Sequence, residues 1–342
     1  MWGIMKKITI EDIAKDANVS IKTVSRVFNH EPNVRDETRK RVLEVAEALN
    51  YRPNLSARSL ASNKSFIIVH FHDNPNPDYI DRINQGLHKA CRSAGYFSVN
   101  EPLPLSDDSY AALAATYLTS FHVDGALLSP PLCDDPALLA VLREKNVPYT
   151  RISPMFEKHK SGSTYIDDKA ASTMMTNHLI DLGHKRIAFI AGPASHGSTS
   201  ERTAGFLNAL ESSNLSVQDC PQYSGDFSFR SGFEAGQKII ESGHNASAIF
   251  AANDEMAVGA MMATMKAGLD IPADMSIAGF DGSRIGDILW PQLTTIRQPI
   301  RKLSERATNI LLTSLRSSEL DIVCEELPVT LLARGSSAKP KD

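Results

Sequence analysis

The first fifty residues carry apolar side chains at the spacing of amphipathic helices. Apolar positions recur at intervals of three and four, which predicts three short helices around a small shared core. The three stretches are 9–17, 20–28 and about 36–49. Thr9, with Asp12 three residues later, suits the start of the first helix, and Ser20 suits the start of the second. Asn18 falls in the short connection between them, where a positive φ is expected and asparagine is tolerated.

From residue 66 onward, short runs that are apolar throughout alternate with helical stretches. The runs expected to form strands are 66–71, 96–99, 125–129, 186–192, 248–253 and 276–281. Apolar strands separated by helices are typical of a parallel sheet that is covered on both faces. The pattern falls into two halves, about 65–165 and about 166–293, and the chain from about 294 to 334 is expected to cross back and pair the two lobes.

These patterns divide the 342 residues into three parts, and a chain of this length supports more than one core. We expect an all-α helix-turn-helix headpiece over 8–53, a linker over 54–64, and a two-lobed α/β body with parallel sheets over 65–338. Two short helices joined by about three residues form the helix-turn-helix unit that binds DNA.

The distribution of charge supports a nucleic-acid role for the headpiece alone. Residues 1–64 contain 12 Lys and Arg against 8 Asp and Glu, a balance of +4. The remaining residues contain 24 against 32, a balance of −8. A basic head on an acidic body indicates that only the head meets a polyanion.

The composition excludes several other classes of protein. The four cysteines are scattered without paired spacing, so we expect no metal site, no disulfide framework and no bound cofactor. No apolar run approaches the ~20 residues that span a bilayer, and no signal-peptide pattern is present, so we expect a cytoplasmic protein without membrane contact. The motifs of P-loop, dinucleotide-binding, zinc-protease and nucleophile-elbow enzymes are absent from the sequence, which predicts that the protein is not an enzyme.

The second predicted helix carries side chains suited to reading DNA. In a helix-turn-helix unit this helix enters the major groove N-terminus first, so Ile21 and Lys22 lead and Arg26 follows one turn later. Lysine and arginine donate to guanine, and isoleucine contacts a thymine methyl group. The further positions expected to face DNA, most of them by holding phosphates, are Thr9, Ser20, Thr23, Ser25, Asn29 and Tyr51. For this stretch taken alone, a solvent-exposed surface helix is the alternative.

The headpiece sequence also resembles a known family. ITIEDIAKDANVSIKTVSRVFN, followed by TRKRVLEVAEALNYRPNLSARSLAS, is similar to the headpiece of LacI/GalR (lac-repressor/galactose-repressor) transcriptional regulators, although Asn18 replaces their usual turn glycine. The resemblance implies that 54–64 is a hinge that folds on operator DNA, with Leu60 wedged between central base pairs and Ala57 against the dimer mate. We include Asn54 in the same DNA-binding set. A flexible linker is the alternative for this segment.

The resemblance extends over the body, whose two halves are similar to the lobes of periplasmic binding proteins. Ligands of such open sheets lie beyond the carboxyl ends of the strands, where this sequence has several polar residues. These strand ends and the family's ligand positions together give an expected effector site of Asp73, Tyr79, Ser129, Arg151, His196, Ser198, Arg202, Phe227, Asn253 and Asp281. Arg151 stands where some sugar-binding members have an acid, so its partner is either a negative group or a neighbouring side chain.

These observations predict a dimeric, sequence-specific transcriptional repressor of carbohydrate genes. Its expected partners are palindromic double-stranded operator DNA, a second copy of the chain, and a small sugar or sugar derivative as effector. Carboxylates and amides suit sugar hydroxyls, and an aromatic face suits the CH surface of a sugar. A nucleobase-type or other small-metabolite co-repressor is the alternative effector. A sugar-binding transport receptor and an enzyme are the alternative functions.

Overall fold

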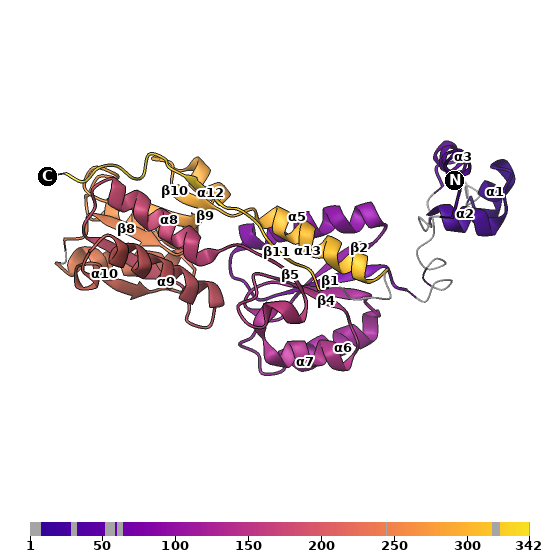
Figure 1. Ribbon diagram of the computed structural model, residues 1–342, viewed down its shortest axis with the longest axis horizontal. Coiled ribbons are helices and arrows are strands. Elements are labelled where there is room, and N and C mark those ends of the chain that lie inside the picture. Colours follow the sequence, from indigo (N-terminus) through magenta and orange to yellow (C-terminus); the bar gives the residue numbers. More distant parts are fainter. Residues whose placement is uncertain are drawn as a thin grey trace, which may run out of the picture. The chain divides into compact units, whose positions relative to one another are not determined.

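The computed structural model describes residues 8–28, 33–51, 59, 64–243, 245–316 and 322–341. The chain divides into two compact units, Met1–Phe66 and Ile67–Asp342, which we call the headpiece and the body. Figure 1 colours both units along the sequence. Among the described residues, no helix is both long enough and apolar enough to cross a membrane.

Over residues 8–28 and 33–51 the headpiece has three helices around a small apolar core. They are α1 (Ile10–Asp16), α2 (Ile21–Phe28) and α3 (Asp36–Ala48). Their limits agree with the three stretches predicted from helical spacing. The buried side chains that they share are Ile13, Ala14, Ala17, Val24, Val27, Val34, Val42 and Ala46.

The starts of α1 and α2 follow the local signals in the sequence. Thr9 and Asp12 form a capping box, in which the Asp12 carboxylate accepts a hydrogen bond from the Thr9 N–H at 2.8 Å. The Ser20 hydroxyl oxygen accepts a hydrogen bond from the Thr23 N–H at 3.1 Å and so caps α2. Each such cap stabilises a helix by ~1 kcal/mol, because it satisfies a backbone donor that has no partner within the helix. Asn18 has a φ of 51°, the positive value expected in the turn.

The first lobe of the body contains a six-stranded parallel sheet, with strands in the order β11-β5-β4-β3-β1-β2. The strands are β1 (Ile67–His72), β2 (Phe97–Pro102), β3 (Gly125–Leu128), β4 (Tyr149–Ile152), β5 (Gly162–Tyr165) and β11 (Cys324–Glu326). The helices are α5 (Pro77–Ala94), α6 (Tyr110–Phe121), α7 (Pro136–Glu144) and α13 (Ile300–Ser314). In Figure 1, α5 and α13 lie on one side of this sheet, and α6 and α7 lie on the other.

The second lobe contains a six-stranded sheet in the order β12-β10-β9-β8-β6-β7, in which only β10 and β12 pair antiparallel. The strands are β6 (Ile187–Ala191), β7 (Gln222–Ser224), β8 (Ala248–Ala251), β9 (Ser276–Asp281), β10 (Thr294–Arg297) and β12 (Thr330–Leu332). The helices are α8 (Asp168–Asp181), α9 (Gly197–Ser212), α10 (Phe229–Glu241), α11 (Asp254–Lys266) and α12 (Arg284–Ile288). Within this lobe, α8 packs against α9, and α10 packs against α11.

The described part of the chain passes between the lobes at three places. β5 of the first lobe leads into α8 of the second, β10 leads back into α13, and β11 is followed by β12 in the second lobe. The segment 294–334 therefore contributes α13 and β11 to the first lobe and β10 and β12 to the second. Figure 1 shows α13, which comes late in the chain, lying beside α5.

The fold class predicted from the sequence is confirmed. The six expected strands appear as β1, β2, β3, β6, β8 and β9, each within a few residues of the predicted limits. The other six strands were not predicted. They are only three or four residues long and are rich in polar residues, as in TTIR and CEE, so they carry no clear apolar run.

Candidate DNA-binding face and interlobe pocket

Helix α2 separates its residues into a packed face and an exposed face. Val24 and Val27 are buried in the headpiece core. Lys22 is exposed, Arg26 is half-buried, and Ile21 at the start of the helix keeps 47% of its surface exposed. This arrangement suits a helix whose N-terminal end meets base edges, because an exposed isoleucine and a long cationic side chain complement a thymine methyl group and a guanine.

The hydroxyl groups expected to hold phosphates are engaged to different extents. Thr9 Oγ1 donates a hydrogen bond to Asp12 Oδ2 at 2.8 Å, which uses its one donor inside the capping box. Ser20 and Thr23 share a hydrogen bond of 2.9 Å between their hydroxyl groups, which leaves one of the two hydroxyl protons for another acceptor. In this arrangement, Ser20 and Thr23 together retain a donor for phosphate, whereas Thr9 does not.

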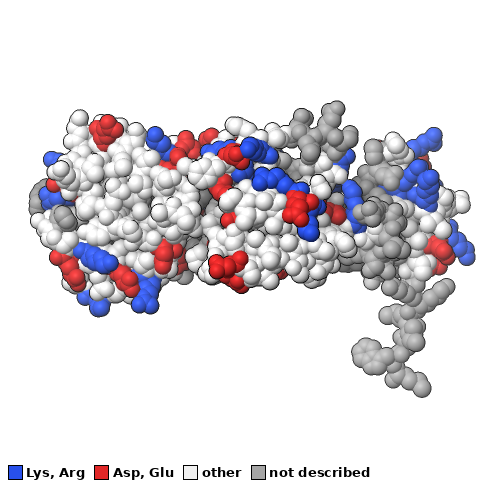
Figure 2. Space-filling model, turned by 90° about the horizontal axis from the view of Figure 1, so that it is seen from below, with Lys and Arg blue, Asp and Glu red and all other residues white. Residues whose placement is uncertain are grey.

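The remaining expected DNA contacts lie partly outside the described residues. Ser25 is half-buried on α2. Tyr51 packs against Phe28 with the ring centroids 5.7 Å apart, and burial raises the pKa of its phenol. Figure 2 shows more Lys and Arg than Asp and Glu on the visible face of the headpiece. The positions outside the described residues are Asn29, Asn54, Ala57 and Leu60, together with most of the predicted hinge.

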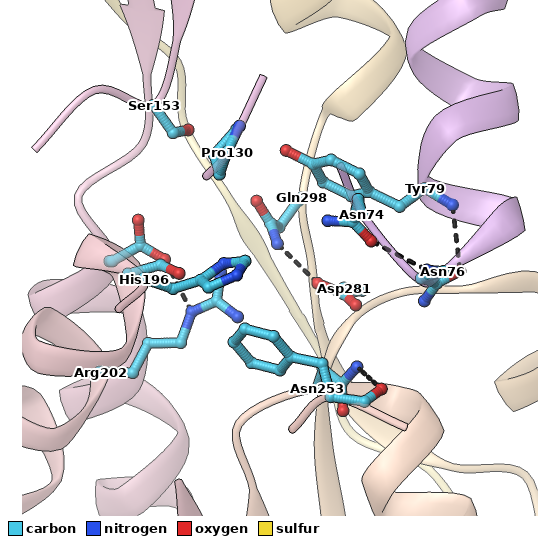
Figure 3. Close-up of a pocket in the computed structure, with 13 residues that line it drawn as sticks. Asn74, Asn76, Tyr79, Pro130, Ser153, His196, Arg202, Asn253, Asp281 and Gln298 are labelled. Carbon is cyan, nitrogen blue, oxygen red and sulfur yellow. Dashed lines mark hydrogen bonds and ion pairs between the residues drawn. The ribbon is translucent and has the colours of Figure 1, made fainter. Parts of the chain in front are cut away.

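A pocket lies between the two lobes of the body (Figure 3). Its lining residues come from the segments at the carboxyl ends of strands in both sheets, which is where open α/β sheets bind ligands. The residues are Asn74, Asn76, Tyr79, Pro130, Ser153, Asp168, His196, Ser198, Arg202, Phe227, Asn253, Asp281 and Gln298.

Most of the effector residues expected from the sequence meet in this pocket. Of the expected residues that line the pocket, Tyr79 comes from the first lobe, at the start of α5, and the other six come from the second lobe. The expected residues that line the pocket are Tyr79, His196, Ser198, Arg202, Phe227, Asn253 and Asp281.

Three expected residues are not among the lining residues, and the structure corrects their positions. The Asp73 carboxylate accepts a hydrogen bond from the Leu105 N–H at 2.9 Å. The Ser129 hydroxyl is buried and forms a hydrogen bond of 2.9 Å with Nε2 of His70. Arg151 lies within β4 rather than after a strand, and its side chain is almost fully buried in the first lobe.

Arg151 has a structural partner in Asp134, one of the two possibilities that the sequence left open. Its guanidinium group lies 3.4 Å from Asp134 Oδ1 and donates hydrogen bonds to Ser161 Oγ at 2.8 Å and to the Phe156 carbonyl oxygen at 2.9 Å. Asp134 also accepts a hydrogen bond from the Met155 N–H at 2.7 Å. Arg151 and Asp134 therefore hold the loop that follows β4, which carries the pocket residue Ser153.

The Arg202 guanidinium group forms one wall of the pocket. Its Nε donates to Asp168 Oδ1 at 2.8 Å and its Nη1 donates to the Ala252 carbonyl oxygen at 2.7 Å. Its carbon centre lies 3.8 Å from the centroid of the Phe280 ring. Burial raises the pKa of Asp168 even though Arg202 opposes the shift. The pair is fixed in place, and Nη2 of Arg202 remains as a donor for a ligand.

The Asp281 carboxylate lies opposite, at the end of β9. Its Oδ1 accepts a hydrogen bond of 2.6 Å from the Gln298 amide, as Figure 3 shows. Its φ of 129° is rarely adopted by residues other than glycine and costs ~1–3 kcal/mol, so the surrounding structure fixes the position of the side chain. Burial raises the pKa of Asp281, with Arg202 opposing the shift, and burial also raises the pKa of the neighbouring Asp254.

An aromatic surface completes the pocket. The Phe227 and His196 rings meet edge to face with centroids 5.2 Å apart. The Asn253 amide donates to the Phe227 carbonyl oxygen at 2.9 Å and fixes the backbone that carries this ring. A Cβ at Gly192 would lie 2.2 Å from the Phe227 ring, so the approach requires glycine. Burial lowers the pKa of His196, which favours its neutral form.

Residues 9–54 match bacterial regulatory proteins of the lacI family, and residues 176–337 match a periplasmic binding protein-like domain. Over 336 residues the chain is 33% identical to catabolite control protein A of Priestia megaterium, with 96% of this chain and 99% of that protein covered. The chain belongs to the LacI family.

Solved structures agree with this assignment. The lac repressor dimer bound to operator and the anti-inducer ONPF superimposes with a TM-score of 0.76 and 30% identity, covering 97% of this chain and 100% of that one. The complex of the transcriptional regulator CelR with cellobiose has a TM-score of 0.74 and 27% identity, covering 96% of this chain and 99% of that one. As a LacI-family member, the protein is a DNA-binding transcriptional regulator and not an enzyme, as predicted.

Several pocket residues of this LacI-family chain were not included in the predicted site. Asn74 belongs to the polar group after the first predicted strand, and Asn76 caps α5, so local signals for both existed. Asp168 and Gln298 follow β5 and β10, two strands that the sequence did not reveal. The other omitted residues are Pro130 and Ser153.

Proposed function

We propose that the protein is a homodimeric cytoplasmic repressor whose binding to a roughly palindromic operator is controlled by a small sugar held in the interlobe pocket. The observation that carries this proposal is the pocket itself, in which Asp281 and Arg202 of the second lobe face Asn74 and Tyr79 of the first. A ligand bound there touches both lobes of a chain that also carries a helix-turn-helix headpiece.

The chemistry of the pocket suits a sugar. The Asp281 carboxylate accepts hydrogen bonds from hydroxyl groups, and Arg202 Nη2 donates to a ring or hydroxyl oxygen. The Phe227 ring offers a flat apolar surface for the CH face of a sugar. The CelR structure, which has the same fold, is a complex with cellobiose, which supports a carbohydrate as the effector class.

The DNA part of the proposal rests on α2. One headpiece makes few base contacts, so specificity requires two headpieces on paired half-sites, and a two-fold dimer supplies them. The lac repressor, similar over 97% of this chain, is a dimer bound to operator. We propose that Ile21, Lys22 and Arg26 contact base edges and that the other DNA-facing residues position the helix.

Control requires that the ligand bind the two lobe arrangements with different affinity. We expect a coupling free energy of ~1–3 kcal/mol between sugar and operator binding. A ligand that bridges both lobes provides this difference, because it fits only one of their relative positions.

The test is an operator titration with the full chain, using an operator selected from a random DNA library and a panel of sugars. Arg202→Ala and Asp281→Ala should bind the operator about as well as wild type without sugar and should lose the response to the sugar that acts on wild type. Glu211→Ala, an exposed position on α9, is the control and should respond normally. A full response in both pocket variants would contradict the proposal.

A further inference from the structure

The charged side chains of the interlobe pocket are few, and their balance restricts the ligand. Asp168, Arg202 and Asp281 are the only Asp, Glu, Lys or Arg residues among the lining residues. His196 is neutral there, because burial and the nearby Arg202 lower its pKa. The charge that a ligand meets therefore depends on how these three groups pair with one another.

The positive charge of Arg202 is already compensated within the protein. Its Nε donates to Asp168 Oδ1 at 2.8 Å, and both side chains are nearly buried, so solvent does little to screen the pair. Its Nη1 is occupied by the Ala252 carbonyl oxygen at 2.7 Å. Arg202 retains a hydrogen-bond donor for a ligand, but the cationic charge that an anion would need is already balanced.

The negative charge of Asp281 is attracted by Arg202 and Arg82 but forms no direct ion pair with either. In the described part of the chain, no lysine or arginine forms an ion pair with its carboxylate. Gln298 supplies a neutral amide donor at 2.6 Å. The guanidinium group of Arg82 binds the Asp281 carbonyl oxygen rather than the carboxylate, at 3.3 Å, and is itself ion-paired with Asp78 at 3.1 Å.

A second carboxylate lies behind Asp281 and adds to the negative potential. Asp254 is fully buried beneath the pocket, and its oxygens accept hydrogen bonds from Thr295 Oγ1 at 2.6 Å and from the Ser283 N–H at 2.6 Å. Burial and, after it, the proximity of Asp281 raise the pKa of Asp254 to about 7, so this carboxyl group carries only part of a negative charge near neutral pH. A further negative charge beside these two carboxyl groups is unfavourable, because like charges repel. A ligand carboxylate or phosphate would add such a charge.

We propose that this pocket accepts an uncharged or cationic sugar and rejects the corresponding sugar acid or sugar phosphate, because its lining holds two carboxylates, Asp168 and Asp281, against the single guanidinium group of Arg202, which is ion-paired with Asp168. The inference rests on the proposed sugar-responsive function and specifies its ligand class. Like charges brought together in a desolvated site oppose binding, and this is a common source of specificity. We expect a sugar acid to bind at least roughly tenfold more weakly than the neutral sugar of the same skeleton.

The experiment is calorimetric and thermal-shift titration of the full chain with matched sets of ligands at millimolar concentration. The sets are glucose, glucosamine, glucuronate and glucose phosphate, and the equivalent derivatives of galactose, mannose and ribose where they exist. The neutral or amino member of a set should stabilise the wild-type protein, and the acid and phosphate of the same set should not.

Two variants test whether charge is the cause. Asp168→Asn keeps the shape of the residue but releases the charge of Arg202, so binding of the acid should improve relative to the neutral sugar. Asp281→Asn removes the carboxylate that has no direct ion pair and should reduce the discrimination in the same direction, even if Asp168→Asn fails to fold. Asp181→Asn makes the same charge change at an exposed position on α8 and should leave the discrimination unchanged.

The possible results separate this inference from the proposed function. Preference of the wild type for an acid or phosphate would overturn the inference while supporting a sugar effector. Discrimination that persists undiminished in both Asp168→Asn and Asp281→Asn would also overturn it, because charge would then not be responsible. No binding by any member of any set would contradict the sugar effector itself.

Discussion

The guanidinium group of Arg82, on α5 of the first lobe, donates hydrogen bonds of 3.3 Å to the carbonyl oxygen of Asp281 in the second lobe. It also donates to the Gly282 carbonyl oxygen at 3.3 Å. Asp281 thus presents its carboxylate to the pocket and its backbone to the opposite lobe. A ligand that moves the Asp281 carboxylate also acts on the backbone to which Arg82 of the first lobe is hydrogen-bonded. Arg82 therefore links binding of a ligand in the pocket to the relative position of the two lobes.

Replacing this arginine tests the connection. Arg82→Met removes the side-chain donor to the Gly282 and Asp281 carbonyl oxygens, although the Asp281 oxygen keeps the Gln298 N–H at 3.2 Å, and we expect the free energy of unfolding to fall by ~1–3 kcal/mol. The sugar concentration that half-saturates the operator response should also shift, because the lobes are no longer held at this point. Chemical denaturation and operator titration measure the two effects. Arg92→Met, at an exposed position on the same helix, is the control. Equal unfolding free energies and equal operator responses in the two variants would refute the role of Arg82.

The second prediction concerns base reading by α2. Arg26→Ala should weaken operator binding by ~1–3 kcal/mol and relax the preference at particular base pairs, because arginine donates to specific groups of a base edge. Ser25→Ala should weaken all sequences about equally if that hydroxyl contacts only phosphate. Binding of both variants to a randomised operator library provides the measurement. An unchanged base preference in Arg26→Ala would mean that this arginine does not read sequence.

The third prediction is a loss of stability in acid caused by His70. Its Nδ1 lies 3.0 Å from Asn84 Oδ1 and its Nε2 lies 2.9 Å from the Ser129 hydroxyl, so the buried neutral ring is fully hydrogen-bonded. Burial, aided by His72, lowers the pKa of His70 from 6.5 to about 3. Below pH 6.5, therefore, this histidine becomes protonated in the unfolded chain but stays neutral in the folded chain. The stability contributed by the neutral ring is present above that pH and is lost as the pH falls towards 3.

Denaturation at a series of pH values measures this effect. The free energy of unfolding should fall by up to about 1.4 kcal/mol per pH unit from this group alone. His70→Gln should be less stable than wild type at neutral pH but should lose stability less steeply on acidification. His88→Gln, exposed on α5, should follow the wild-type profile. If the free energy of unfolding of His70→Gln falls with pH as steeply as that of wild type, other groups cause the loss of stability in acid.

The fourth prediction concerns dimerisation. Trp290 and Ile288, at the end of α12, have 89% and 73% of their surfaces exposed, which is unusual for large apolar side chains in one short segment. We expect a second copy to cover them, and Trp290→Ser should raise the dimer dissociation constant by roughly tenfold or more, as loss of an aromatic anchor does in other interfaces. Sedimentation over a range of concentrations measures the constant. Phe121→Ser, exposed on α6, is the control. Equal dimer dissociation constants for Trp290→Ser and Phe121→Ser would show that Trp290 does not lie in the dimer interface.

The sequence located the correct edge of both sheets but not every side chain that turns into the pocket. Asp73 and Asn74 follow the same strand, and the turn directs Asn74 to the pocket while Asp73 binds the Leu105 N–H. Arg151 was misplaced because β4 carries an arginine in a buried strand, and apolar patterning does not reveal such a strand. Its charge is satisfied by Asp134, a residue distant in sequence that only the folded chain brings near.

The three described helices of the headpiece were predictable almost completely, because their signals are local. The capping box of Thr9 and Asp12, the positive φ of Asn18 and the helical spacing all act within a few residues. The pairing of Asp168 with Arg202 depends instead on the packing of α8 against α9, which no short-range pattern specifies. This is why the residues that line the pocket were partly foreseen and their charge balance was not.

The repeated passage of the chain between the lobes has a consequence for biosynthesis. The first lobe needs α13 and β11, residues Ile300–Ser314 and Cys324–Glu326, to complete one face and one edge of its sheet. A ribosome releases these residues only after most of the second lobe has been made, whereas the headpiece precedes both lobes and its contacts are local. The DNA-binding unit can therefore fold while the lobe nearest to it in sequence still exposes part of its apolar interior. During that interval the nascent chain depends on chaperones or on rapid completion to avoid aggregation.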